Sequence, residues 1–154
     1  MRTIRDLLAE QPLFADLPAA DLDFLAGCGR NVHFDVGQHV LHSGAAADYF
    51  YLLRKGAVRL EIDQPGRGSL AAETLRQGDI VGISWLFPPY RYAFDGLAVE
   101  PCDLIALDAN CMRTKCDEDP RLGYLLMKRF AALLTTRLHH LQLRALDLYA
   151  NDVR

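Results

Sequence analysis

Short runs of alternating apolar and polar residues, separated by glycine turns, occupy residues 30–107 and constrain the fold of this chain most strongly. The clearest run covers residues 58–63, where valine, leucine and isoleucine alternate with arginine, glutamate and aspartate, as in a half-buried strand. Further short strands are expected at residues 32–34, 40–41, 49–53, 69–75, 80–81, 94–99 and 104–107, where apolar, aromatic and branched residues gather. Many short strands at this spacing predict a β-sandwich or a rolled barrel.

Helical patterns flank the strands on both sides. Residues 3–10 predict a short amphipathic helix, and a second helix is expected from Pro18 to about Gly27. After the strands, a short helix is expected near residues 110–116, and a long one runs from Pro120 to about Tyr149. The cluster of acidic residues at 117–119 suits the start of that long helix.

The long helix carries an apolar seam at alternating steps of three and four residues. Its members are Tyr124, Met127, Ala131, Leu134, Leu138, Leu141, Ala145 and Leu148. A second row, at positions 122, 126, 130 and 133, predicts that the first half of the helix packs on the β-domain. Because the seam outlasts this row, we expect a homodimer whose interface includes Met127, Leu134, Leu138, Leu141 and Leu148. A helix packed wholly within one chain is the alternative.

Length and charge limit the classes of protein to consider. A chain of 154 residues predicts a single domain over 1–154, with the N-terminal helix and strands in 13–108 and the C-terminal helices in 109–149. The net charge of −3 argues against a general nucleic-acid binder. No apolar run is long enough to cross a bilayer, and no secretory signal opens the sequence, so we expect a cytoplasmic protein without membrane contact.

Residues 78–93 stand out as a candidate ligand loop. They begin with a Gly-Asp turn, continue through a short apolar strand to Gly82, and end in an aromatic and proline-rich loop that carries Arg91. Glycine lets backbone approach a ligand closely, successive backbone N–H groups can bind an anion, and arginine suits phosphate. The segment therefore indicates a pocket for a small anion. An ordinary loop with a surface arginine is the alternative.

Several local patterns, taken in order, carry a resemblance to a known family. Gly37 and Gly44 mark early turns, the run at 49–60 reads as a strand-turn-strand unit, and Gly-Asp-Ile-Val-Gly at 78–82 precedes Arg91-Tyr92-Ala93. Over about residues 13–148 this order resembles the cyclic nucleotide-binding domain of the catabolite activator protein (Crp/Fnr-like) family. The resemblance implies a mainly β fold with flanking helices: a double-stranded β-helix, or jelly-roll-like β-roll, plus a long C-terminal helix.

The resemblance also implies which residues would bind the ligand. They are Gly82, Ile83, Ser84, Arg91, Tyr92 and Ala93. In that family a glutamate that bonds the ribose 2′-hydroxyl normally follows the glycine, whereas Ile83 stands there in this chain. Isoleucine cannot accept that bond, and a buried unpaired hydroxyl costs about 1–3 kcal/mol. We therefore expect poor affinity for cyclic AMP, and we expect Arg91 to point toward the backbone N–H groups of residues 82–84.

The resemblance implies a regulatory, non-enzymatic module with no catalytic residues and no cofactor. Transcription factors of the family continue into a helix-turn-helix domain, but this sequence ends at Arg154, so we expect no direct DNA binding. The predicted function is a sensor or adaptor that binds a small anionic ligand, a nucleotide among the candidates, and signals through its C-terminal helix to an unknown effector protein. The alternative is a structural interaction domain whose pocket is closed by Trp85, Phe87 and Tyr90.

A haem or redox sensor is a third alternative, and it rests on histidines and cysteines. His33 and His42 are expected on neighbouring strands, with Cys28 nearby, but these residues show no paired ligand spacing, so no metal site is predicted. The four cysteines include no Cys-x-x-Cys motif and are expected to be free thiols. Cys111 and Cys116 share a short helical region, which leaves a redox role for that pair open.

Overall fold

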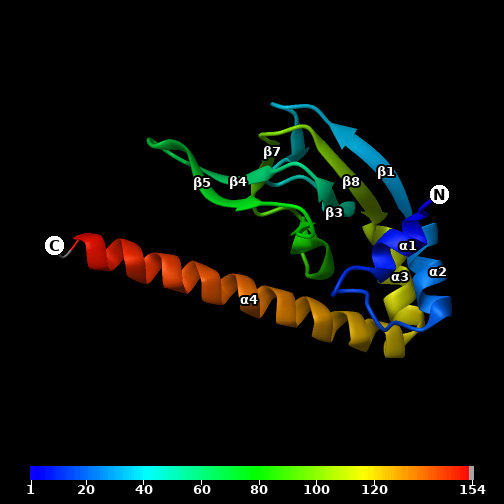
Figure 1. Ribbon diagram of the computed structural model, residues 1–154. Coiled ribbons are helices and arrows are strands. Elements are labelled where there is room, and N and C mark those ends of the chain that lie inside the picture. The colour runs from blue at the N-terminus through cyan, green and yellow to red at the C-terminus, as the bar shows by residue number, and fades with distance from the viewer. Residues whose placement is uncertain (153–154) are drawn as a thin grey trace. The chain divides into compact units, whose positions relative to one another are not determined.

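The computed structural model describes residues 1–152 and divides the chain into two compact units, one of residues 1–114 and one that begins at Lys115. The first unit contains α1 (Ile4–Ala9), α2 (Ala19–Gly27), eight strands and a short 3₁₀ helix, η1 (Ile83–Leu86) (Figure 1). Helix α3 (Ala109–Glu118) contains the boundary, and α4 (Pro120–Asp152) belongs to the second unit.

The eight strands form two four-stranded antiparallel sheets. Their bounds are β1 Gly29–Phe34, β2 His39–Leu41, β3 Tyr49–Lys55, β4 Val58–Gln64, β5 Gly68–Leu75, β6 Ile80–Val81, β7 Asp95–Ala98 and β8 Cys102–Asp108. One sheet has the order β1-β8-β3-β6, and the other has the order β2-β7-β4-β5. Apart from the β4–β5 hairpin, consecutive strands lie in different sheets, as in a jelly roll, so the predicted fold class is confirmed. Figure 1 shows β1 beside β8, and the hairpin of β4 and β5.

The core lies around β3 and β8, which are buried on successive residues. Residues 50–53 of β3 and 104–107 of β8 are all buried, so both faces of these strands are covered. Next to Gly29 of β1, Ile4 of α1 lies beside Ile105 and Leu107 of β8. Helix α1 therefore packs on the outer face of this sheet, which explains a continuous apolar run where strand alternation would leave polar residues.

The N-terminal helices lie close to their predicted positions because each begins at a residue that favours a helix start. Helix α1 begins after Thr3, whose hydroxyl accepts a bond from the Asp6 N–H while the Asp6 carboxylate accepts one from the Thr3 N–H, which is a capping box. Helix α2 begins after Pro18. Arg5 of α1 donates to Asp23 of α2 at 2.5 Å, which joins the two helices.

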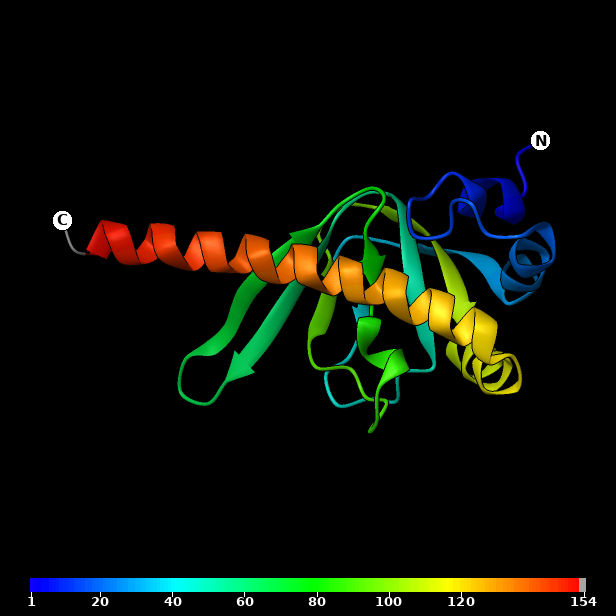
Figure 2. The ribbon, with the colours of Figure 1, turned by 90° about the horizontal axis from the view of Figure 1, so that it is seen from below.

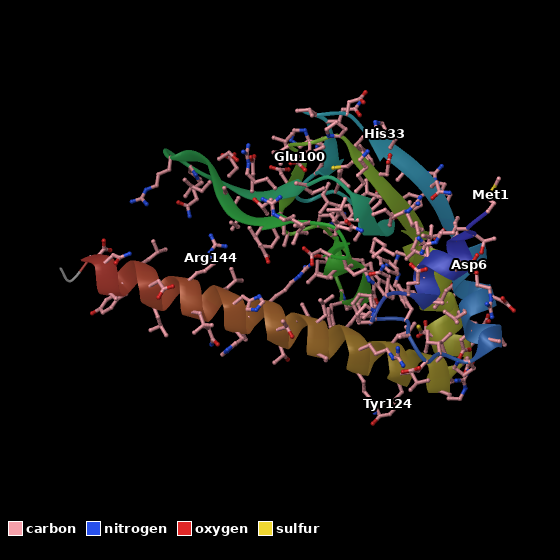
Figure 3. All side chains as sticks on the ribbon, viewed as in Figure 1. Met1, Asp6, His33, Glu100, Tyr124 and Arg144 are labelled. Carbon is pink, nitrogen blue, oxygen red and sulfur yellow. The ribbon has the colours of Figure 1, made fainter. Side chains whose placement is uncertain are left out.

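The second unit is dominated by α4, an unbroken helix of 33 residues (Figure 2). Its second apolar row is buried at Leu122, Leu126 and Phe130. The predicted seam is exposed over most of its length, for example 42% at Met127 and 56% at Leu138. Figure 3 shows Tyr124, which opens the seam, and Arg144 projecting from this helix. Within residues 1–152, no helix is both long and apolar enough to cross a membrane.

The turn between β3 and β4 requires Gly56. Its φ of +98° lies in the left-handed region, and an added Cβ would lie 2.3 Å from the Pro101 carbonyl oxygen and 2.9 Å from Cys102 Sγ. Gly37 also has a left-handed φ, +90°, but nothing lies within 4 Å of its added Cβ. The two glycines therefore separate the cost of backbone strain from the cost of a clash.

We expect Gly56→Ala to lower the free energy of unfolding by more than about 2 kcal/mol, because the clash adds to the strain. Gly37→Ala is the matched control and should cost only the strain, about 1–2 kcal/mol. Urea unfolding of the two variants measures the difference. An equal decrease in the free energy of unfolding for both variants would show that the close packing of Gly56 against Pro101 and Cys102 does not add to the cost of the substitution.

Candidate functional site

The segment between β6 and β7 is the loop that the sequence singled out. It begins at Gly82, whose φ of +87° and ψ of 61° are left-handed, and continues directly into η1. The sequence predicted an irregular loop here and missed this short helix. Ile83 and Ser84 form its first two residues, and both are half-buried. The first N–H groups of a helix have no acceptor within that helix, so this turn presents donors.

Trp85 anchors the loop in the core. Its ring is fully buried and stacks on Phe50 of β3, with centroids 4.6 Å apart and planes within 11°. Phe87 and Tyr90, which the interaction-domain hypothesis also placed over the pocket, are 46% and 37% exposed. Of these three aromatic residues, Trp85 therefore packs as a core residue and the other two lie at the surface.

Arg113 of α3 holds the same loop, and the sequence analysis did not identify it. Its Nη1 donates to the Trp85 carbonyl at 2.7 Å, and its guanidinium lies 4.4 Å from the Tyr90 ring centroid. Its Nη2 donates to Asn110 Oδ1 at 2.6 Å, which orients the guanidinium from within α3. The local sequence contains no signal for this contact, because Arg113 lies 28 residues beyond Trp85.

The end of the loop runs antiparallel to residues 44–47. The Gly44 N–H donates to the Tyr92 carbonyl at 2.8 Å, and the Tyr92 N–H donates to the Ala45 carbonyl at 3.0 Å. Arg91 is exposed, and its Nη1 donates to the Gly44 carbonyl at 2.9 Å. Ala93, the last predicted ligand residue, is also exposed. The predicted role of Arg91 toward an anion stays a prediction.

Tyr92 fills the space beside Gly82. An added Cβ at Gly82 would lie 3.1 Å from Tyr92 Cε1 and 3.3 Å from Leu41 Cδ2. The Tyr92 hydroxyl donates to the Tyr49 carbonyl at 2.5 Å, and burial raises the pKa of this phenol above its usual value. The glycine is therefore needed for close packing against Tyr92 as well as for its left-handed backbone.

The expected approach of His33 to His42 is wrong. Strand β1 pairs with β8 while β2 pairs with β7, so the two histidines belong to different sheets. His33 projects from β1 (Figure 3) and lies directly across from Asp103 of β8, with Nδ1 and Oδ1 2.7 Å apart. That bond, with a second to Asp35, raises the pKa of His33 and makes it a surface ion-pair residue.

His42 instead lies beside His39, which the sequence analysis overlooked. The two rings stack with centroids 4.8 Å apart, and Asp95 of β7 lies close to both. The signal was present in the sequence as His39-Val40-Leu41-His42, a pair of histidines three residues apart. Regular strand alternation would have assigned them to opposite faces.

The cysteine that lies beside Cys111 is Cys28, not Cys116. The sulfur atoms of Cys28 and Cys111 share a hydrogen bond at 2.6 Å, although the residues are 83 positions apart. Burial, followed by the bond to Cys111, raises the pKa of the Cys28 thiol to about 12. Cys28 is therefore a protonated thiol at neutral pH and a poor nucleophile.

Comparisons with known proteins identify the family and the fold. The family model for the cyclic nucleotide-binding domain matches residues 31–119, which include the whole of the 78–93 loop. A cGMP-dependent protein kinase, isozyme 2, from Drosophila melanogaster is 29% identical over 85 residues. This match covers 48% of this chain but only 9% of the kinase.

Solved structures share the fold over most of the chain. A protein of Geobacter metallireducens GS-15, described as a cyclic nucleotide-binding protein, superposes with a TM-score of 0.80 at 26% identity and covers 90% of this chain and 100% of that chain. The catabolite activator protein of Thermus thermophilus superposes with a TM-score of 0.69 at 26% identity and covers 91% of this chain and 63% of that chain.

The contacts of Arg113 generate a prediction about the stability of the loop. Arg113→Ala should lower the free energy of unfolding by about 1.5–3 kcal/mol, because it removes charge-assisted bonds to the backbone of a part-buried segment. Trp85 is the only tryptophan in the chain, so its fluorescence during urea unfolding is a direct probe. Arg67→Ala, in the exposed hairpin loop, is the control and should change stability by less than about 0.5 kcal/mol. An Arg113→Ala variant as stable as the wild type would contradict this role.

Proposed function

This chain belongs to the cyclic nucleotide-binding domain family, and we propose that it is a non-enzymatic regulatory module that binds a small anionic ligand at the 82–93 loop and signals through α4. The observation that carries the proposal is Arg91, an exposed cation at the end of the loop that begins at the left-handed Gly82, inside the segment that the family model matches. Nucleotides are the first class of ligand to test.

The backbone of the loop supports an anion as the ligand. A left-handed residue followed by helical residues turns successive N–H groups toward one side, which is the geometry of an anion-binding nest. Gly82, Ile83 and Ser84 would supply those groups in the ligand-bound protein. Tyr92 and Ala93 would complete the end of the loop next to Arg91. The Tyr92–Gly82 packing fixes the distance between these two parts of the site.

The Arg91 guanidinium can bind a phosphate while it keeps its hydrogen bond to the Gly44 carbonyl. A guanidinium has five N–H donors, and the contact with the Gly44 carbonyl engages one nitrogen. The other donors form a planar fork that matches two phosphate oxygens. In this proposal the Gly44 contact orients the guanidinium before the ligand arrives.

Ile83 makes the ligand different from a ribonucleotide held through its 2′-hydroxyl. Its side chain offers no acceptor, and a hydroxyl buried against it would cost about 1–3 kcal/mol. A nucleotide that needs no hydrogen-bond acceptor at residue 83, or a simpler phosphate ester, fits the site better. The proposal therefore predicts that this chain prefers such ligands over cyclic AMP, unlike cyclic AMP binders that have an acceptor at this position.

Signalling would use the exposed seam of α4. Leu138 is 56% exposed, Leu141 42% and Leu148 67%, and exposed leucines at heptad spacing are typical of a helix that pairs with another helix. In a homodimer formed through this seam, ligand binding would change the arrangement of the two helices. An effector protein that binds these helices would respond to that change.

The ligand-site prediction concerns Arg91 and Ile83 together. A thermal-shift screen across cyclic mononucleotides, cyclic dinucleotides and linear nucleotides identifies a ligand, because a compound selective for the native state raises its apparent stability. Arg91→Ala should then weaken that ligand roughly 10- to 100-fold. Arg91→Lys should restore only part of the affinity, because lysine lacks the planar fork.

Ile83→Glu should increase the affinity for cyclic AMP, because it restores an acceptor for the ribose hydroxyl. Isothermal titration of both proteins measures the change. Tight and equal binding of cyclic AMP by the wild type and Ile83→Glu would contradict the role given to Ile83. If no compound in the screen stabilises the protein, the interaction-domain alternative takes precedence.

The assembly prediction concerns Leu138. Leu138→Asp places a charge in the seam and should convert a dimer into monomers, measured by sedimentation. Leu143→Asp is the matched control, since Leu143 is 48% exposed on the same helix but lies outside the seam. Circular dichroism confirms that both variants are folded. A Leu138→Asp protein that sediments as the same dimer as the wild type would rule out the seam as the interface.

A further inference from the structure

A cluster of metal-ligating side chains lies outside the loop described above. His39, His42 and Asp95 each offer one ligand atom, and these atoms all lie within 4.8 Å of one another. Both histidines are exposed and Asp95 is half-buried, so the cluster is open to solvent. We propose that these three residues form a site for a divalent transition-metal ion of the Zn²⁺ class on the sheet that contains β2 and β7.

An irregularity in β2 brings the two histidines together. Residues three apart on a regular strand point to opposite faces, so His39 and His42 should diverge. The register between β2 and β7 shifts, because His39 lies opposite Leu97 and Leu41 lies opposite Gly96, so β2 has one more residue than its partner over this interval. Val40 and Leu41 are both buried, which shows that the alternation is broken there. A bulge of this kind redirects side chains, and here it places both imidazoles on the same side.

Asp95 is held in position for a third ligand. One of its carboxylate oxygens, Oδ1, accepts a bond from the Ser43 N–H at 2.8 Å. Ser43 follows His42 directly, so this bond ties the histidine segment to the first residue of β7. The second carboxylate oxygen is left for a cation. Supporting bonds to a ligating carboxylate are a usual part of metal sites.

Two further charged residues lie next to the cluster. Glu61 of β4 lies directly opposite Asp95 in the ladder between β4 and β7. Glu61 accepts a bond from the Ser69 hydroxyl at 2.8 Å and is ion-paired with Arg59 at 2.6 Å, so the charges of Glu61 and Arg59 offset each other. Asp95 is therefore the carboxylate that remains to balance the charge of a cation beside the histidine pair.

The donor set selects the class of ion. Two imidazole nitrogens and one carboxylate oxygen suit Zn²⁺ and its first-row neighbours, whereas Ca²⁺ and Mg²⁺ prefer oxygen ligands. The rings are stacked within 16° of parallel, so their in-plane lone pairs do not yet converge. Binding requires one ring to rotate about its Cβ–Cγ bond, and both histidines are exposed to solvent. Water would complete the coordination.

The test titrates the purified protein with Zn²⁺ against a chromogenic chelator. We expect one high-affinity ion per chain in the wild type. His39→Ala/His42→Ala should weaken binding by more than the roughly 10–100-fold that loss of a supporting hydrogen bond costs a metal site. His139→Ala/His140→Ala is the matched control: it removes two exposed histidines from α4 and should bind Zn²⁺ like the wild type.

Asp95→Asn provides a second variant in case the double alanine protein folds poorly. Asparagine keeps an oxygen for the Ser43 N–H but loses the carboxylate charge, so the fold should persist while Zn²⁺ binding falls. Visible and near-ultraviolet absorption of bound Co²⁺ reports the coordination geometry and any thiolate ligand, and we expect no thiolate-to-metal charge-transfer band. Binding that survives in His39→Ala/His42→Ala, a thiolate band from the cysteines, or no high-affinity ion in the wild type would each overturn the proposal.

Discussion

The stack of Trp85 on Phe50 is the contact on which the candidate ligand loop depends. Both rings are fully buried, so the stack fixes η1 against β3, an inner strand of its sheet. Once η1 is fixed, Gly82 at its start and the Tyr90 turn after it have little freedom. Arg113 holds the same turn through the Trp85 carbonyl. A loop rich in aromatic residues and proline can therefore present its backbone in one arrangement before any ligand is present.

The strand pattern predicted a β-sandwich or rolled barrel, and the family resemblance predicted the jelly-roll-like fold with its long C-terminal helix. Residues 58–63 alternate, and their strand faces solvent on one side. Residues 49–53 do not alternate, yet they were still predicted as a strand because aromatic residues favour one and a Lys-Gly turn follows at 55–56. The long helix follows from its unbroken 3.6-residue periodicity after Pro120. These signals are local, so a single sequence contains them.

The features that could not be predicted depend on contacts between distant residues. Arg113 donates to the carbonyl of Trp85, 28 residues away, and Cys28 bonds to Cys111, 83 residues away. No rule of local spacing predicts either contact. The spacing of His39 and His42 is visible in the sequence, but strand alternation assigns the two side chains to opposite faces. Only the bulge in β2 brings them to the same side. The sequence singled out Gly82 as a place where the backbone could approach a ligand, and the structure shows that the nearest side chain to its missing Cβ is that of Tyr92. Local sequence rules can therefore identify an unusual position, but they cannot predict which distant residues it contacts.

The length of α4 has a mechanical consequence. At 1.5 Å per residue, its 33 residues span about 50 Å, which exceeds the diameter of a small domain. A rigid rod of that length acts as a lever, so a pivot of about 5° at its first turn would displace its last turn by roughly 4 Å. A movement of only a few atoms near the base of such a rod would therefore appear at its tip as a much larger sideways displacement.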